Sequence, residues 1–179
     1  MLQNGAVRAL AVLAAGLVVV SGADGQEARL RADRYCLSCL CTAATGCDVK
    51  AACQQNDPLD ICGPFYMSEP YWVDANVTAL DAYAAYEFKE CATDTECAGA
   101  AVASYMHNFA RDCDGDGQVT CKDFGLMHYL GYSSCADEDL VQSGLSSPFY
   151  SAHVTCLERM AGLLAREDFT TAPGYAPLV

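Results

Sequence analysis

Alternating aspartates between residues 112 and 123, in the segment DCDGDGQVTCKD, have the spacing of a calcium-binding loop. In such a loop oxygen atoms at positions 1, 3, 5, 7 and 12 bind the ion, and a glycine at position 6 allows a sharp turn. The alternative is an acidic turn without metal, in which neighbouring carboxylates would repel one another. We predict a structural Ca²⁺ site of weak affinity, because the aspartate at position 12 is shorter than the usual glutamate. The predicted ligands are Asp112, Asp114, Asp116, the backbone carbonyl of Gln118, and Asp123.

Cysteine is the second residue type with chemical potential, because the chain has 12 of them. Zinc binding is one use, since Cys36-x-x-Cys39 has the spacing of a ligand pair. No second pair of this kind and no histidine pair accompanies it in the sequence. We therefore predict a disulfide framework, with the pairing left open. Its members are Cys36, Cys39, Cys41, Cys47, Cys53, Cys62, Cys91, Cys97, Cys113, Cys121, Cys135 and Cys156.

The N-terminus predicts an oxidising compartment for these cysteines. Arg8 precedes an apolar run from Ala9 to Val20, and small residues follow before a predicted cut near Ala23. The run is about 12 residues long, whereas a bilayer span needs about 20. We therefore expect a signal peptide rather than an anchor, and a secreted, extracellular protein without a membrane span.

The charge excludes one class of partner. The formal net charge is −13, and such a surface repels DNA and anionic lipid over a Debye length. We expect no nucleic-acid partner and no mechanism based on a basic patch. The oligomeric state stays open.

The spacing of cysteines and aromatic residues resembles that of the invertebrate-type (destabilase) lysozyme family over residues 35–156. The resemblance is densest in the arrangements C-x-x-C-x-C-x5-C, C-x8-C-G-P-F-Y and E-P-Y-W-V-D, and the calcium-type insertion is similar to that of arthropod members. These segments begin at Cys36, Cys53 and Glu69, and the match continues through Cys91-x5-Cys97, Tyr105-Met106, Phe109-Ala110 and Cys121-x-Asp123-Phe124.

The resemblance implies an α+β, predominantly helical fold: a small disulfide-rich lysozyme-like domain with a minor hairpin or irregular lobe. It also implies a relationship to muramidases, the glycosidases that cleave β-1,4 bonds between N-acetylmuramic acid and N-acetylglucosamine. A retaining glycosidase needs one protonated carboxyl to protonate the leaving oxygen, and an ionised carboxyl about 5 Å away.

Both carboxyls of the family's hydrolytic pair are replaced in this chain. The family's glutamate corresponds to Ala44, and its aspartate corresponds to Asn56. An alanine cannot transfer a proton, and general acid catalysis typically contributes about 10²–10⁴-fold. Asp57 is adjacent to Asn56 and is a candidate substitute for the second carboxyl only. Asp48 lies four residues beyond Ala44, a displacement of about 6 Å along a helix, too far to replace it.

Two other comparisons with the family bear on function and stability. An isopeptidase activity, credited to some members, would require a contact between Ser38 and His128, although a lone histidine on a helix is more often structural.

Ala75 and Ala101 stand where the family has cysteines. The simplest account is one disulfide deleted as a unit, at a cost of about 2–4 kcal/mol that the calcium loop would partly offset.

A largely helical chain must position these residues. Residues 78–91 have helix-forming composition, with apolar residues spaced i, i+3, i+4, i+8. Thr93 and Glu96 form a predicted capping box that opens a helix running to about Arg111.

Further elements follow along the chain. A short helix is predicted after Cys121 and stops at Gly131, and residues 152–166 form a last helix. Turn-forming residues predict a hairpin or irregular lobe near 50–66. The predicted organisation is a signal peptide at 1–23, a lead-in at 24–34, the lysozyme-like domain at 35–166 and a disordered tail at 167–179.

Asn76-Val77-Thr78 is a predicted glycosylation sequon, with a solvated turn as its alternative.

Three functions remain open: a glycan-binding or immune-modulating protein that has lost hydrolysis, an active lysozyme in defence or digestion, and a structural extracellular protein. The first two require a cleft for peptidoglycan or a chitin-like glycan.

Overall fold

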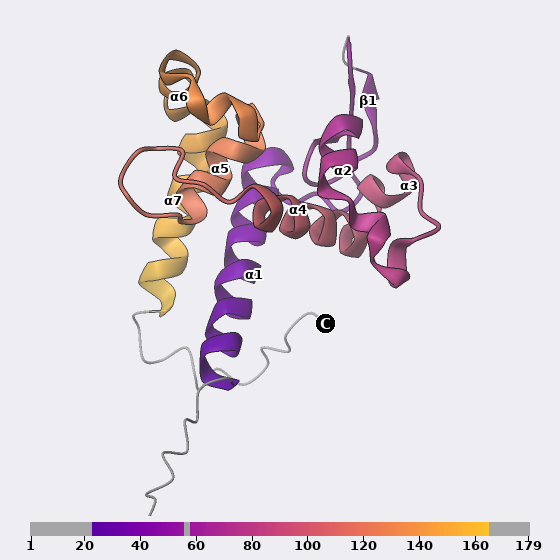
Figure 1. The fold of residues 1–179 in the computed structure, drawn as a ribbon, viewed down its shortest axis with the longest axis horizontal. Coiled ribbons are helices and arrows are strands. Elements are labelled where there is room, and N and C mark those ends of the chain that lie inside the picture. Colours follow the sequence, from indigo (N-terminus) through magenta and orange to yellow (C-terminus); the bar gives the residue numbers. More distant parts are fainter. Residues whose placement is uncertain (1–22, 56–57, 165–179) are drawn as a thin grey trace, which may run out of the picture.

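The computed structural model describes residues 23–55 and 58–164, and they form a mostly helical arrangement with one small antiparallel sheet (Figure 1). The predicted α+β, predominantly helical class is therefore confirmed. No helix in this part of the chain is both long and apolar enough to cross a membrane. The predicted signal peptide as far as residue 22, and the predicted tail at 167–179, lie outside the described residues.

Two long helices from opposite ends of the sequence lie side by side. Helix α1 (Ala23–Thr45) packs along α7 (Pro148–Leu164), as Figure 1 shows. Where we predicted a lead-in at 24–34, the structure instead continues α1. Cys36, Cys39 and Leu40 are buried on this helix at i, i+3, i+4 spacing. The cysteine cluster therefore supplies the apolar face of a helix rather than a turn-rich loop.

The predicted hairpin lobe is a three-stranded antiparallel sheet. Its strands are β1 (Gln54–Gln55), β2 (Asp60–Cys62) and β3 (Met67–Ser68), in the order β1-β2-β3. Ile61 is opposite Gln54 on one side and Ser68 on the other. Asn56 and Asp57, in the connection between β1 and β2, lie outside the described residues.

Helix α4 (Thr95–Phe109) runs between the two halves of the molecule, with α2 (Glu69–Ala75) packed against it (Figure 1). Its N-cap is Asp94, one residue after the predicted Thr93: the carboxylate accepts the N–H of Cys97 at 2.8 Å. The hydroxyl of Thr93 instead donates to the carbonyl of Lys89, 2.8 Å away. The predicted capping box was therefore wrong: Thr93 ends the preceding helix, and Asp94 alone caps α4.

Ala75 and Ala101 are both fully buried in the core where α2 meets α4. The hydroxyl of Ser104, one turn after Ala101, donates to the carbonyl of Ala75 at 2.6 Å. Apolar packing and this hydrogen bond therefore join the two helices here.

The predicted helix at 78–91 was wrong over most of its length. The chain forms two 3₁₀ turns, η1 (Val77–Ala79) and η2 (Asp81–Tyr83), before a short α3 (Phe88–Thr93). Leu80, the first residue of the supposed apolar face, is 48% exposed. Asn76 has a φ of 50°, which ends α2 and turns the chain, so the segment is divided among tight turns.

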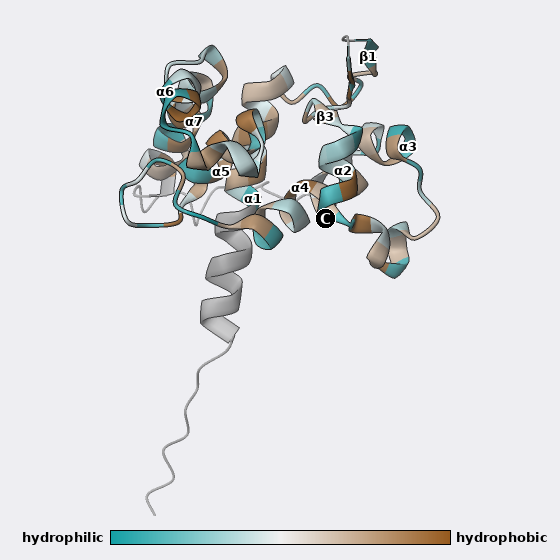
Figure 2. Ribbon diagram, turned by 45° about the horizontal axis from the view of Figure 1, so that its top comes forward, coloured by the Kyte–Doolittle hydropathy of each residue, from teal (hydrophilic) through white to brown (hydrophobic). Residues whose placement is uncertain are grey.

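The C-terminal half forms a helical group on α1. Helix α5 (Cys121–Leu130) begins and ends where predicted, with Gly131 after its last residue. A 3₁₀ turn, η3 (Tyr132–Ala136), and α6 (Glu138–Leu145) follow. Helix α7 begins four residues before the predicted 152, because Pro148 opens it and the Ser147 hydroxyl accepts the N–H of Tyr150 at 3.1 Å. In Figure 2 the loop between α4 and α5 is mostly hydrophilic, whereas α5 and α7 carry hydrophobic segments.

All twelve cysteines are paired, so the zinc alternative at Cys36 and Cys39 was wrong. Two bridges attach α1 to the C-terminal helices, and one ties the acidic loop to η3. The other three close short local loops. The pairs are Cys36–Cys121, Cys39–Cys156, Cys41–Cys47, Cys53–Cys62, Cys91–Cys97 and Cys113–Cys135.

Candidate functional site

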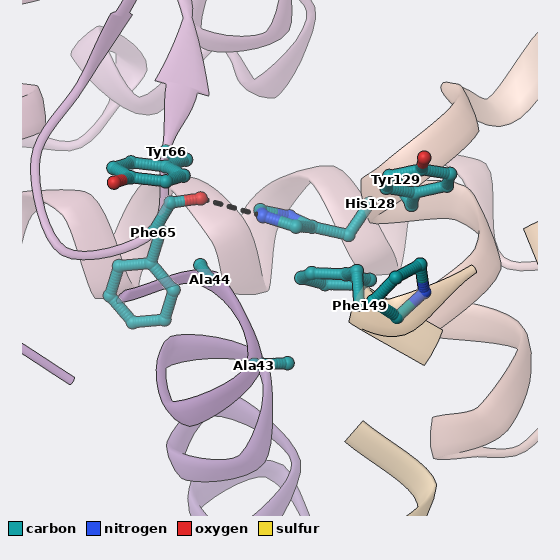
Figure 3. A pocket seen from close by; sticks show the side chains of 8 residues that line it. Ala43, Ala44, Phe65, Tyr66, His128, Tyr129 and Phe149 are labelled. Carbon is teal, nitrogen blue, oxygen red and sulfur yellow. Dashed lines mark hydrogen bonds between the residues drawn. The ribbon is translucent and has the colours of Figure 1, made fainter. Parts of the chain in front are cut away.

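A hollow of about 430 Å³ lies where four parts of the chain meet. The end of α1, the turn between β2 and β3, α5 and the start of α7 each supply two neighbouring residues. We call it the first hollow, and Figure 3 shows its side chains. Its lining residues are Ala43, Ala44, Phe65, Tyr66, His128, Tyr129, Pro148 and Phe149.

A second hollow of about 300 Å³ shares Tyr66, His128 and Tyr129 with the first. We call the two together the groove. The second hollow is more polar, and its further walls come from β2, β3, α2, α4 and the segment after α5. Besides the three shared residues, it is lined by Ile61, Ser68, Pro70, Tyr71, Asp74, Tyr105, Leu130, Gly131, Tyr132 and Ser133.

His128 joins the two sides of the groove. Its Nε2 lies 2.8 Å from the backbone oxygen of Phe65, and its Nδ1 lies 3.2 Å from the hydroxyl of Tyr71. A neutral ring satisfies both contacts, with Nε2–H donating and Nδ1 accepting. Burial lowers the pKa of His128 to about 4, with a smaller opposing effect from the Phe65 carbonyl. His128 is therefore a neutral structural bridge at neutral pH.

Tyr66 occupies an unusual backbone conformation in the wall shared by both hollows. Its φ is 49°, a left-handed value that costs a bulky L-residue on the order of 1–2 kcal/mol. The ring is nevertheless 39% exposed, and its hydroxyl accepts a hydrogen bond from Gln54 at 2.9 Å. Strain of this kind is concentrated at functional sites, which makes Tyr66 a candidate ligand-contacting residue.

Gly63 fixes the turn that carries Tyr66. It has a φ of 73°, and a Cβ added to it would lie 1.6 Å from the backbone oxygen of Ala92. The N–H of Tyr66 donates to the Gly63 carbonyl at 3.1 Å. Only glycine therefore allows this turn to pack against α3 and present Tyr66 to the groove.

Ala44, which the resemblance aligns with the glutamate of the family's hydrolytic pair, lines the first hollow. Ala44 is partly buried near the end of α1, and its side chain is one of those that line the hollow (Figure 3). None of the lining residues carries a carboxyl group. Asp48 is exposed beyond the helix end and is not a lining residue; its carboxylate accepts the N–H of Lys50 at 2.9 Å. Asn56 and Asp57 cannot be placed, since they lie outside the described residues.

The isopeptidase arrangement considered from sequence is not formed. Both ring nitrogens of His128 contact other groups, Phe65 and Tyr71. Ser38 is exposed on α1 and does not line either hollow. The pair that would activate a serine nucleophile is therefore not assembled.

The acidic loop brings three predicted calcium ligands together. Carboxylate oxygens of Asp112, Asp114 and Asp116 lie within 4.8 Å of one another. Partial burial raises the pKa of Asp114, and the neighbouring carboxylates raise it further. Hard oxygen donors at this separation fit Ca²⁺.

Asp123 does not fit the role of the fifth ligand in this geometry. It is fully buried, and one oxygen accepts the N–H groups of Cys113 and Asp114 at 2.7 and 3.1 Å. The other accepts the N–H and hydroxyl of Thr120 at 2.7 and 3.1 Å. Both oxygens are thus occupied by donors that close the loop and cap α5. The carbonyl of Gln118 stays a prediction.

Asn76 is exposed at the end of α2, so the predicted glycosylation sequon lies at the surface. Its modification stays a prediction.

Sequence reasoning missed the groove's walls. Tyr66, Tyr129, Phe149 and Asp74 come from four separate elements, and no local spacing indicates that they meet. Tyr129 stacks on Phe149 with ring centroids 5.4 Å apart. The one available signal was Tyr66, which follows Gly63-Pro64 in a predicted turn.

Comparison with known proteins gives a consistent result. Residues 33–151 match the family model described as Destabilase. A lysozyme of Meretrix lusoria is 29% identical over 102 residues, which are 56% of this chain and 75% of that protein. An invertebrate-type lysozyme of Ruditapes philippinarum is 28% identical over 102 residues, covering 56% and 68%. The solved structure of Meretrix lusoria lysozyme in complex with Aeromonas hydrophila PliI gives a TM-score of 0.49 at 26% identity, over 62% of this chain and 83% of that one.

Proposed function

Because the chain belongs to the Destabilase family of invertebrate-type lysozymes, we propose that it is a secreted lysozyme-like protein that binds glycan without cleaving it efficiently. The groove supplies the binding surface, and bound peptidoglycan or chitin-like glycan is the expected ligand. A secreted protein of this kind would act in immunity by recognising glycan.

The observation that carries the proposal is the methyl group of Ala44 in the first hollow. Hydrolysis in this family requires a carboxyl at the corresponding position to protonate the leaving oxygen. His128 does not replace it as an acid at neutral pH, because burial lowers its pKa to about 4. The residues that line the first hollow therefore supply no carboxyl for this step.

Retained aromatic surface supports binding. Tyr66 and Tyr129 are 39% and 50% exposed, and the Phe149 ring stacks on Tyr129. Pyranose rings present flat faces of C–H groups that pack on such rings. The two hollows share Tyr66, His128 and Tyr129 and together extend from α7 to α2, so a bound glycan could contact residues of both.

The acidic loop has a separate role in this proposal. Ca²⁺ bound by Asp112, Asp114 and Asp116 would neutralise three close carboxylates and stabilise the loop. The loop residues do not line either hollow, so the ion would be structural rather than catalytic.

Two measurements on the purified secreted protein test the proposal. Binding to a chito-oligosaccharide column and clearing of a bacterial-wall suspension are measured together, with an active invertebrate-type lysozyme as positive control. We expect retention on the column and no clearing above buffer. Clear lysis would establish the alternative, an active lysozyme that uses Asp57 and another acid. Absence of both binding and lysis would favour a structural extracellular protein.

A further inference from the structure

The second hollow differs from the first in carrying a carboxylate, and we infer that it selects sugars with a free amine. The chemical class is a β-1,4-linked glucosamine chain, fully or partly deacetylated, whose ammonium group is recognised by Asp74. This inference rests on the proposed glycan binding and names the ligand class of the same groove.

The charges around the groove favour a cation. Asp74 is the one acidic residue among those lining the two hollows, and no lysine or arginine lines either. His128 is the one lining side chain that could carry a positive charge, and it is neutral at neutral pH because burial lowers its pKa to about 4. An ammonium near Asp74 would gain a charge-assisted hydrogen bond, whereas a ligand carboxylate would be repelled.

The position of Asp74 is not explained by the stability of the fold. It is exposed in the last turn of α2, where the helix dipole disfavours a negative charge by a few tenths of a kcal/mol. The negative charge of Asp74 acts on Tyr105, which lines the same hollow. Burial is the main cause that raises the pKa of Tyr105, and the charge of Asp74 raises it further. An asparagine would suit the helix at least as well.

Tyrosines line the second hollow together with this carboxylate. Tyr71 and Tyr105 stack with ring centroids 3.8 Å apart, and both line the second hollow with Tyr132. Aromatic faces attract ammonium groups within about 6 Å. The guanidinium of Arg111, which is not a lining residue, already lies 5.6 Å from the Tyr132 ring centroid. Its positive charge opposes a second cation at that ring, so the amine is placed beside Asp74.

The charge of Asp74 and the net charge of the protein also distinguish between peptidoglycan and a chitin-like glycan as the ligand. N-acetylmuramic acid carries a carboxylate on its lactyl group, whereas chitin-type chains are neutral and their deacetylated forms are cationic. In a protein of net charge −13, the anionic glycan is disfavoured both by Asp74 and by the surrounding field. The groove is therefore better suited to a chitosan-type chain than to peptidoglycan.

The test compares calorimetric binding of three probes: a glucosamine hexamer, an N-acetylglucosamine hexamer and a soluble peptidoglycan fragment. We expect the glucosamine hexamer to bind at least about tenfold more tightly than the acetylated one. Asp74→Asn should abolish most of that preference. Arg111→Gln should increase the preference, because it removes the opposing charge.

A matched variant separates a local effect from the charge of the whole protein. Asp81→Asn removes the same charge from an exposed residue that does not line the groove, and its preference should match that of the unaltered protein. Equal losses in Asp74→Asn and Asp81→Asn would overturn the inference. Binding of the acetylated hexamer with no amine preference would also overturn it, yet leave the proposed function standing. Failure of every probe to bind would contradict both.

Discussion

The acidic loop at 112–123 contains four aspartates, whereas the first hollow of the groove has none among its lining residues. In the loop every aspartate accepts at least one backbone N–H, as with Asp112, whose two oxygens accept from Gly115 and Gly117. In the hollow the walls are aromatic rings, a proline and two methyl groups. Carboxylates thus hold the backbone of the loop, and none is present among the residues that line the first hollow.

This difference shows that the net charge of the chain does not indicate whether it can catalyse hydrolysis. The net charge is −13 because acidic residues are numerous, but a glycosidase needs a carboxyl at a particular position in its groove. Placing a carboxyl in the first hollow, or removing one from the loop, therefore tests the two regions independently.

The largest effect is expected from restoring the missing pair. Ala44→Glu with Asn56→Asp should raise cleavage of a chromogenic chito-oligosaccharide by about 10²-fold or more, because it supplies both a general acid and a second carboxyl. The matched control is Ala43→Glu with Asn56→Asp, since Ala43 is the neighbouring residue in the same hollow. Equal gains in both double variants would mean that position 44 has no special role.

Acidification should destabilise the protein through His128, which joins the two sides of the groove. The folded pKa of His128 is about 4, below the unfolded value of about 6.5. The unfolded state therefore binds more protons between these values, so the stabilisation is complete above about pH 6.5 and is lost as pH falls towards 4. The loss from this group is at most on the order of 3 kcal/mol.

Urea unfolding from neutral pH to about pH 4.5 measures this effect. His128→Gln removes the titrating ring, so its stability should fall less steeply over the same interval, whatever its absolute value. His153 will contribute in the same direction, because burial also lowers its pKa. A slope unchanged by His128→Gln would show that the ring does not govern the pH response.

A smaller effect should separate binding from stability at Tyr66. Tyr66→Asn relieves backbone strain at a φ of 49° but removes the ring, so the free energy of unfolding should change by less than about 1 kcal/mol. Glycan affinity should fall by about tenfold through loss of the aromatic contact. A variant that keeps full affinity would remove Tyr66 from the binding surface.

The smallest expected effect concerns the loop. If Ca²⁺ is present at about ten times its dissociation constant, it adds about 1.4 kcal/mol to stability, or roughly 3 °C in Tm for a domain of this size. Chelation should reverse that shift, and Asp112→Asn should abolish it, whereas Asp139→Asn on α6 should not. A Tm insensitive to calcium would leave the loop as a hydrogen-bonded acidic turn.

Local signals predicted the parts of this molecule that depend on near neighbours. The stop of α5 at Gly131 and the hairpin lobe follow from turn chemistry, and the disulfide framework follows from cysteine number and compartment. The helix over 78–91 failed because its apolar spacing had no common buried face to meet. Propensity alone does not specify a helix without tertiary packing.

Only part of the candidate site could be predicted from the sequence, because its walls depend on tertiary contacts. The replacement at Ala44 could be inferred from the resemblance, but the walls around it come from residues such as Phe65 and Phe149, which are far apart in sequence. The pairing of Cys36 with Cys121, across 85 residues, likewise depends on the complete fold.

The bridge from Cys39 to Cys156 spans 117 residues and has a consequence for survival in protease-rich fluid. A single peptide-bond cut anywhere between those two cysteines leaves both fragments covalently attached. A nicked molecule would therefore migrate as one species without reductant and as two with it. Damage to an exposed loop would not release a piece of the protein.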